Sequence, residues 1–167
     1  MVRMTKRSVI LSILLLIFVN WGRQEGSQQN QPNIISAYGI TLTRESSPRE
    51  VASVLIKALD NNDEVMLTKL VAIKNEMEEF KKIYQRYGQR AKKITPEKVA
   101  ITTAKGWIAS YAIFEPGRTR IIGVKVEGEK AYVYCVGINS QGKERAFEIR
   151  MVREDGWWKV IAGLHPK

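Results

Sequence analysis

The last third of the chain, residues 119–164, constrains the fold more than any other part of the sequence. Apolar residues recur at every second position in four successive segments, and glycine-containing turns separate the segments. A period of two is the pattern of a β-strand, whereas a helix repeats every three to four residues. Residues 119–164 therefore predict four antiparallel strands that follow one another as a meander.

Two short turns and one apolar segment define how these strands connect. Gly128-Glu129 suits a two-residue turn, and Asp155-Gly156 suits a turn in which both central residues have positive φ. Residues 131–138 are apolar on both faces, which predicts a central strand. The alternation assigns inward rows to the other strands: Ile122, Val124 and Val126; Phe147, Ile149 and Met151; Trp158, Val160, Ala162 and Leu164.

A capping box predicts the first helix. Ser47 and Glu50 are spaced to exchange hydrogen bonds with each other's backbone, and Pro48 occupies the first helical position. Apolar residues then recur at helical spacing: Val51, Val54, Leu55, Ala58 and Leu59. Asp63 is suited to cap a second, short helix that ends near Val71.

Two longer helices are expected before the strands. Asn75, with Glu78 three residues later, predicts the start of the third helix, which runs to about residue 93. Thr95-Pro96 starts a fourth helix, which we expect to reach about residue 112. Residues 106–113 alternate well enough to fit a strand too, so the end of this helix is left open.

The N-terminus predicts export. Basic residues precede an apolar run at residues 8–21, which is shorter than the ~20 residues that span a bilayer and matches a secretory signal peptide. Asn20, Trp21 and Arg23 are unsuited to a cleavage site, so residues 1–22 are either a signal peptide or an uncleaved signal anchor. Both interpretations make the rest of the chain extracytoplasmic, secreted or membrane-anchored, and an uncleaved segment 8–21 would contact the membrane. A buried core helix is the less favoured third interpretation.

The remaining chain divides into a tether and one domain. Residues 23–46 begin with a polar, Gln-rich stretch without periodicity, which predicts a flexible tether. Weak alternation over residues 33–45 suggests an extended, weakly ordered end of that tether. Residues 47–167 then form one domain of usual length. The expected fold class is α+β, with N-terminal helices packed on a curved antiparallel meander of about four strands.

The charge of the chain is moderately basic. The net charge is +10, and four basic residues but no acidic ones lie in the first 23 positions, which leaves a net charge of +6 for the remainder. Such a charge suits solubility or an anionic surface nearby, and solvated lysines on helix faces explain it most simply. A nucleic-acid platform needs exposed aromatic residues among basic ones, and only Trp157 is expected to be exposed there. No nucleic-acid partner is expected.

Motifs for cofactors, metals and nucleophilic catalysis are absent from the sequence. It contains no GxGxxG, no phosphate-binding P-loop and no GxSxG elbow. Cys135 lies in the apolar strand and is expected to be a small buried hydrophobe. His165 is the one histidine, so no metal site can be assembled around histidine and cysteine. We expect no cofactor and no metal.

The carboxylates also fail to indicate a catalytic site. A carboxylate needs burial or a like charge nearby if its pKa is to rise into the range of an efficient base. Glu148 alternates with Phe147 and Ile149, so it is expected to point away from the apolar row. The helical acids Glu64, Glu76 and Glu79 are expected to face solvent. No catalytic residue is assigned.

Five aromatic residues are the remaining candidates for a binding site. Trp107, Tyr111, Tyr132, Tyr134 and Trp158 could line a pocket between helix and sheet that takes a small apolar ligand. The alternative is that these rings are core residues whose polar atoms reach the surface.

The order of helices followed by a meander with a Gly-Trp-Trp-Lys-Val strand resembles the nuclear-transport-factor-2-like superfamily, also called the cystatin-like cone. Residues 51–63, 126–133 and 152–161 carry the resemblance, which is nearest to small exported bacterial lumazine-binding-like domains of unknown function. Members of that branch often carry a lipidated cysteine, which this sequence lacks. Enzymes of the superfamily, such as ketosteroid isomerases, use an Asp or His in the cone, and no position here matches.

These observations favour an exported, non-enzymatic binding or assembly domain of the cell envelope. Such a domain could form a homodimer through its open sheet face, as a component of an envelope assembly would. The alternative is a cone-fold enzyme of isomerase or dehydratase type that acts on a small apolar molecule.

Overall fold

The computed structural model describes residues 34–86 and 94–166. The predicted signal peptide or anchor at residues 1–22, most of the predicted tether and the end of the third predicted helix lie outside these residues. Among the described residues, no helix combines the length and apolar character needed to cross a membrane.

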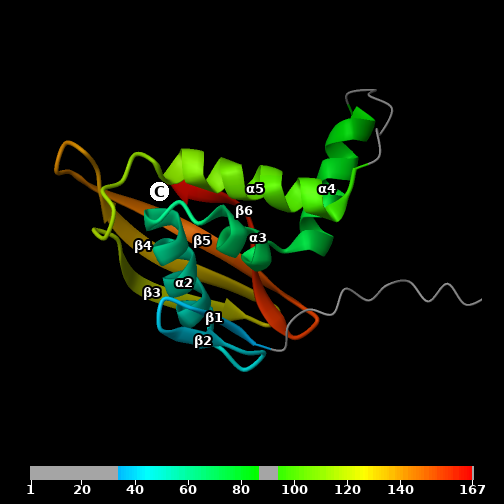
Figure 1. The fold of residues 1–167 in the computed structure, drawn as a ribbon, viewed down its shortest axis with the longest axis horizontal. Helices are drawn as coiled ribbons and strands as arrows, with labels where there is room; N and C mark the ends of the chain where they lie inside the picture. Colours follow the sequence, from blue (N-terminus) through cyan, green and yellow to red (C-terminus); the bar gives the residue numbers. More distant parts are fainter. Residues whose placement is uncertain (1–33, 87–93, 167) are drawn as a thin grey trace, which may run out of the picture. The chain divides into compact units, whose positions relative to one another are not determined.

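A four-stranded antiparallel sheet follows the helices, as the period of two predicts (Figure 1). Its spatial order is the sequence order, so the strands form a meander. The strands are β3 (Arg120–Glu127), β4 (Lys130–Ile138), β5 (Glu144–Glu154) and β6 (Trp157–Pro166). Strand β4 lies between β3 and β5, which confirms its predicted central position.

The two predicted turns connect these strands. Glu127 pairs with Lys130 across Gly128-Glu129, and Glu154 pairs with Trp157 across Asp155-Gly156. Asp155 and Gly156 have φ of 52° and 83°, so both central residues adopt the left-handed region that the turn requires.

A bulge in β3 overturns part of the predicted inward row. The register shifts between Ile121 and Gly123, so two residues there face one residue of β4. Ile121 and Val124 pack against the core, whereas Ile122 is 57% exposed. Val126 is also exposed, because it lies near the end of the strand. The prediction that Ile122 points inward is wrong, whereas Val126 lies on the inward face opposite Ala131 but is not covered.

Strand β6 differs from its prediction at two residues, Trp157 and Ala162. Trp157 was expected to be exposed but is 2% exposed and belongs to the core. Lys159 Nζ lies 5.6 Å from the centroid of its ring. Val71 forms a parallel bridge to Val160 and the Ala72 N–H donates to the Val160 carbonyl, so a further segment runs along this edge of the sheet. Farther along, a second register shift leaves Ala162 exposed instead of inward.

Four helices precede the sheet among the described residues: α2 (Pro48–Asp60), α3 (Glu64–Leu70), α4 (Ile73–Arg86) and α5 (Pro96–Tyr111). Both reciprocal bonds of the predicted capping box form, from Ser47 N to Glu50 Oε2 and from Glu50 N to Ser47 Oγ. Asp63 caps α3 as predicted, because its Oδ1 accepts from Met66 N at 2.9 Å.

The start of α4 lies two residues before the predicted cap at Asn75. The carboxylate of Glu154, at the end of β5, accepts hydrogen bonds from Lys74 N at 3.3 Å and from Asn75 N at 2.9 Å. Lys74 Nζ also pairs with Asp155 at 2.6 Å. The first turn of α4 is therefore capped by the β5–β6 turn, some eighty residues away in sequence.

Helix α5 resolves the choice between helix and strand at residues 106–113. It is helical to Tyr111, and Ala100, Ala104, Trp107 and Tyr111 are all buried along one face. The spacing of three or four residues between successive members of this set predicted this face.

A hairpin replaces part of the predicted tether. β1 (Ile35–Ala37) and β2 (Ile40–Leu42) pair antiparallel across Tyr38-Gly39. Ile35 and Leu42 are buried, and the Tyr38 hydroxyl donates to Asp63 at 2.6 Å. The expectation of a flexible tether is wrong for these residues, because the alternation places their apolar side chains against the core.

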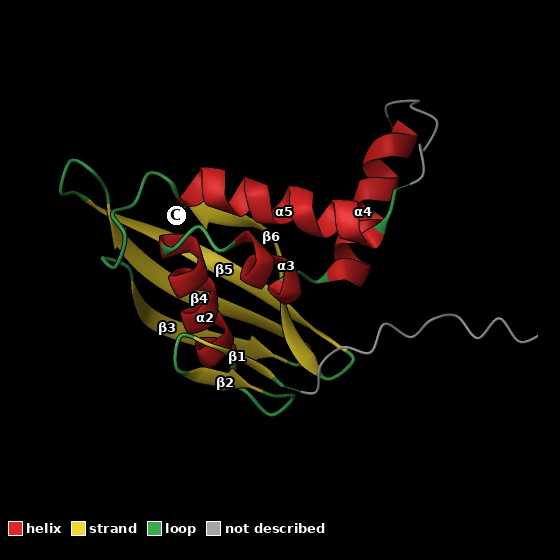
Figure 2. Cartoon of the chain, viewed as in Figure 1, coloured by secondary structure: helices red, strands yellow, loops and turns green. Residues whose placement is uncertain are grey.

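One hydrophobic core joins these elements. Figure 2 shows the helices lying against the sheet. The core contains inward residues of β4 and β5 and the buried faces of α2 and α5: Ala131, Val133, Cys135, Phe147, Ile149, Met151, Val51, Val54, Leu55, Ala104 and Trp107. Helices packed on one antiparallel sheet are the predicted α+β architecture.

Candidate functional site

The five aromatic candidates divide between two faces of the sheet. Trp107, Tyr111 and Trp158 are at most 5% exposed and belong to the core. Tyr132 and Tyr134 are half-buried on the opposite face of β4, because they alternate with the fully buried Val133. The structure therefore does not bring all five rings into one pocket.

Tyr111 links α5 by hydrogen bonds to the end of α2 and to the residue before β3. Its hydroxyl lies 3.0 Å from Asp60 Oδ1, to which it donates, and 2.7 Å from Thr119 Oγ1, from which it accepts. Its ring lies against Phe114 and Phe147, with centroids 5.3 and 6.2 Å away. Burial raises the pKa of this phenol. These contacts are those of a structural tyrosine.

Trp107 and Thr103 differ from Tyr111, because Trp107 Nε1 and Thr103 Oγ1 are buried with no hydrogen-bond partner among the described residues. They lie one helical turn apart on α5. Trp158, the third buried candidate, has the Arg153 guanidinium 4.9 Å above its ring.

Three buried charged residues form the part of the interior that the sequence patterns missed. Glu76 is 3% exposed, and Glu148 and Lys159 are each 5% exposed. The expectation that Glu76 faces solvent is wrong, because α4 lays that side of the helix against β6. Glu148 does point away from the apolar row of β5, yet its neighbours still bury it.

Glu76 binds the backbone of β6. Its Oε1 accepts from Ala162 N at 2.7 Å, at the register shift of that strand. Burial raises the pKa of this carboxyl, the hydrogen bond from Ala162 lowers it, and the charges of Glu79 and Glu154 raise it. The carboxylate thus pairs a backbone N–H that the irregular strand leaves available.

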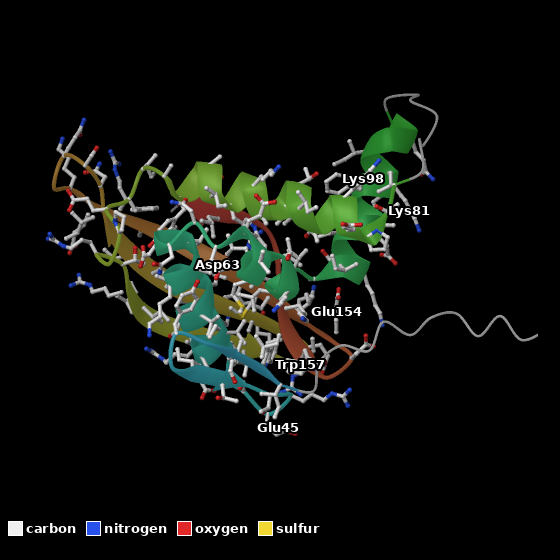
Figure 3. The ribbon with its side chains drawn as sticks, in the orientation of Figure 1. Glu45, Asp63, Lys81, Lys98, Glu154 and Trp157 are labelled. Carbon is white, nitrogen blue, oxygen red and sulfur yellow. The ribbon has the colours of Figure 1, made fainter. Side chains whose placement is uncertain are left out.

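Lys159 links β6 to α3 through a hydrogen bond. Its Nζ donates to the Lys69 carbonyl at 2.6 Å and lies 5.6 Å from the Trp157 ring centroid. Burial lowers the pKa of this amine to about 8, against an opposing effect of the nearby Glu154 and Asp155 charges. In Figure 3, Glu154 and Trp157 lie near each other at this end of the molecule.

The outer face of the sheet carries a mixed aromatic and charged surface. We use "outer sheet face" for Tyr132, Tyr134, Val136, Ile138, Glu148 and Arg150. Glu148 pairs with Arg150 at 2.7 Å, and these two residues lie opposite Tyr134 and Tyr132 in the register. A Cβ on Gly123 would lie 3.3 Å from the Tyr134 ring, so that ring rests against the glycine of β3.

Within the described residues, neither the cysteine nor the potential metal ligands indicate a functional site. Cys135 is fully buried, which confirms the predicted buried thiol, and burial raises its pKa to about 12. Within residues 34–86 and 94–166, no three His, Cys, Asp or Glu side chains gather in a way that could hold a metal ion.

The comparisons with known proteins bear on the fold. No protein-family model matches the sequence, and no curated protein matches it. A solved structure from Campylobacter jejuni, provisionally named as an NTF2-like transpeptidase, matches with a TM-score of 0.50 and 11% identity, over 71% of this chain and 100% of that chain. The finer resemblance to lumazine-binding-like domains stays a prediction. The fold class predicted from the strand meander is confirmed: the chain has the α+β cone fold of the NTF2-like superfamily.

Proposed function

We propose that this chain is an exported, non-enzymatic binding or assembly domain of the cell envelope that meets its partner through the outer sheet face. The observation that carries the proposal is the half-exposed row of Tyr132, Tyr134, Val136 and Ile138 along the central strand. Within the described residues, these four side chains are not part of the core that the helices cover.

The composition of this surface favours a protein partner. Aromatic residues and arginine are enriched at the centres of protein interfaces, and tyrosine contributes contact area at little cost in side-chain entropy. The buried Glu148 pairs with the more exposed Arg150, so a partner would meet a guanidinium that is already held in place beside Tyr132. A central strand is also a rigid platform for such contacts.

A second copy of the chain is the partner that we propose first. A two-fold interface places the same patch on both subunits, and a row of aromatic and aliphatic side chains can pack against its own copy. Export and membrane anchoring through residues 8–21 are part of the same proposal, which the basic residues before that apolar run support.

The engagement of the buried charged groups argues against catalysis. Glu76 accepts from Ala162 N, Glu148 pairs with Arg150, and Lys159 donates to a backbone carbonyl. Each group therefore has a structural partner that it would have to leave during acid–base chemistry.

The test is the oligomeric state of the full chain in detergent, measured by analytical ultracentrifugation. Tyr132→Glu would place an acid opposite Lys125 and Arg150, which the fold tolerates but a tyrosine-centred interface does not. Ile113→Glu, at an exposed residue just after α5, is the matched control. We expect a dimer for the wild type and the control, and a monomer for Tyr132→Glu. A monomeric wild type would rule out the homodimer.

The alternative is a cone-fold enzyme of isomerase or dehydratase type that acts on a small apolar molecule. It is supported by the raised pKa of Glu76 and by the lowered pKa of Lys159, because perturbed pKa values cluster at functional sites. Native mass spectrometry of the purified full chain would detect a retained small molecule. Its loss in Glu76→Gln, with the fold intact, would favour the enzyme over the binding domain.

A further inference from the structure

Helix α5 carries two buried polar atoms, Thr103 Oγ1 and Trp107 Nε1, that have no hydrogen-bond partner among the described residues. Thr103 is 6% exposed and Trp107 is 2% exposed. A buried polar group that pairs with nothing costs the free energy of its desolvation, so native proteins leave very few of them unpaired. Two such atoms on one helix indicate a partner that the described side chains and backbone do not supply.

The two side chains lie on the same side of α5. They are four residues apart, and helical residues at this spacing are neighbours on one face. Long side chains in a helix lean towards its N-terminus, so the Trp107 indole extends over the turn that carries Thr103. Ala100 and Ala104, which are buried on the same face, offer no polar side-chain atom. One small guest can therefore bond to both Thr103 and Trp107.

The chemistry of the two atoms selects a neutral guest with an acceptor oxygen. The indole N–H of Trp107 is a donor only, whereas the hydroxyl of Thr103 can donate or accept. A metal cation is unsuited, because a protonated indole nitrogen offers it no lone pair. An anion is unsuited too, because a buried charge needs a charged partner and the buried residues of α5 include no charged one.

We propose that Thr103 and Trp107 form the polar end of an internal binding site for one neutral oxygen atom, which accepts from Trp107 Nε1 and bonds to Thr103 Oγ1. Water has this chemistry, and buried waters typically make roughly two to four hydrogen bonds to otherwise unpaired groups. A carbonyl or hydroxyl oxygen of a small organic molecule has it as well. The site lies on the core side of α5, so it is independent of a partner on the outer sheet face.

Nuclear magnetic resonance of the ¹⁵N-labelled full chain in detergent tests whether the indole is bonded. A hydrogen bond moves the indole proton of Trp107 downfield, so we expect a downfield position in the wild type. Thr103→Val keeps the shape of the side chain but loses the hydroxyl, which should weaken the hold on the guest and shift this proton upfield. Thr102→Val, at the neighbouring exposed position of α5, is the matched control and should leave the proton where it is.

A crystal structure of the full chain identifies the guest. We expect density within hydrogen-bond distance of both Thr103 Oγ1 and Trp107 Nε1. A peak of one isolated atom supports the proposal with water as the guest. A larger density supports it with an organic molecule, provided that native mass spectrometry finds a matching extra mass that Thr103→Val loses and Thr102→Val keeps.

Three results overturn the proposal. The first is an upfield indole proton in the wild type that Thr103→Val does not move, because the N–H then has no partner. The second is a crystal structure with no density between the two atoms, or with density that contacts only one of them. The third is density at Trp107 Nε1 that belongs to the chain itself, because the partner is then a group of the protein.

Discussion

Replacing Lys159 by methionine should change how the stability of the protein depends on pH. The amine is 5% exposed, and burial lowers its pKa from 10.5 to about 8. As the pH rises through this interval, the folded state releases the proton before the unfolded state does. The unfolded state then binds more protons, so the free energy of unfolding rises with pH. Methionine has a similar length and no proton to release, so Lys159→Met should lack this rise.

The size of the effect follows from the interval between the two pKa values. Each unit corresponds to about 1.4 kcal/mol, so a shift from 10.5 to about 8 amounts to roughly 3 kcal/mol between pH 7 and pH 10.5. At pH 7 the variant lacks the buried charge, which raises its free energy of unfolding. It also lacks the bond from Nζ to the Lys69 carbonyl, which lowers it. That bond is worth about 1.5–3 kcal/mol, so the two contributions nearly cancel there.

The measurement is urea unfolding of the full chain, followed by circular dichroism at several pH values from 7 to 10.5. Taking the difference between wild type and variant cancels the titration of tyrosines and other lysines that the two proteins share. Lys105→Met, at an exposed position on α5, is the matched control. We expect the wild type to gain about 3 kcal/mol relative to Lys159→Met, and nothing relative to the control.

A flat difference between wild type and Lys159→Met, within about 0.5 kcal/mol over this range, would refute the reasoning. It would mean that the ammonium group reaches water in the folded state, so that its burial beside Lys69 and Trp157 does not hold in solution. A difference that falls with pH would mean that carboxylates such as Glu154 stabilise the charged amine more than burial destabilises it.

Three further predictions concern the core and the β6 edge. Trp158→Ala should lower the free energy of unfolding by ~3–5 kcal/mol in urea titrations, because the ring is buried, and a loss below about 1 kcal/mol would show that its face is wrongly assigned. Gly137→Ala should cost about 1–3 kcal/mol, because a Cβ there would overlap the Phe114 ring; adding Phe114→Leu should recover part of the loss in thermal melts, and no recovery would contradict this cause. Glu76→Ala should cost about 1–3 kcal/mol by leaving Ala162 N unpaired, whereas Glu76→Gln keeps an acceptor. Because the pKa of Glu76 is raised, the wild type should lose stability relative to Glu76→Gln as the pH rises above 4.5, and parallel pH profiles would contradict this.

Local signals in the sequence were read correctly because their partners lie a few residues apart. The capping box of Ser47 and Glu50 closes over three residues, and the Asp155-Gly156 turn depends on the φ values of its own two residues. Periodicity likewise identified the buried face of α5, since Trp107 and Tyr111 lie one turn apart.

Tyr132 and Tyr134 of the outer sheet face were among the five candidates of the sequence, but the burial of the charged side chains could not be predicted from it. Alternation indicates which way a side chain points but not what covers it, so it could not show that Lys159 and Trp157 are buried or that Lys159 donates to the Lys69 carbonyl. A helical face rich in charge suggested solvent for Glu76, yet its hydrogen-bond partner lies on β6, 86 residues later. No pattern within a short window contains that information.

The sequence by itself determined the α+β class, the order of the strands and the turns that join them. These follow from period, from capping side chains and from residues that tolerate positive φ, all of which act within a few bonds. Only the tertiary structure decided which charges are buried, where the β3 bulge turns Ile122 outward, and how Glu154 caps α4. Those outcomes depend on contacts between distant segments, whose free energy is gained only when the whole core assembles.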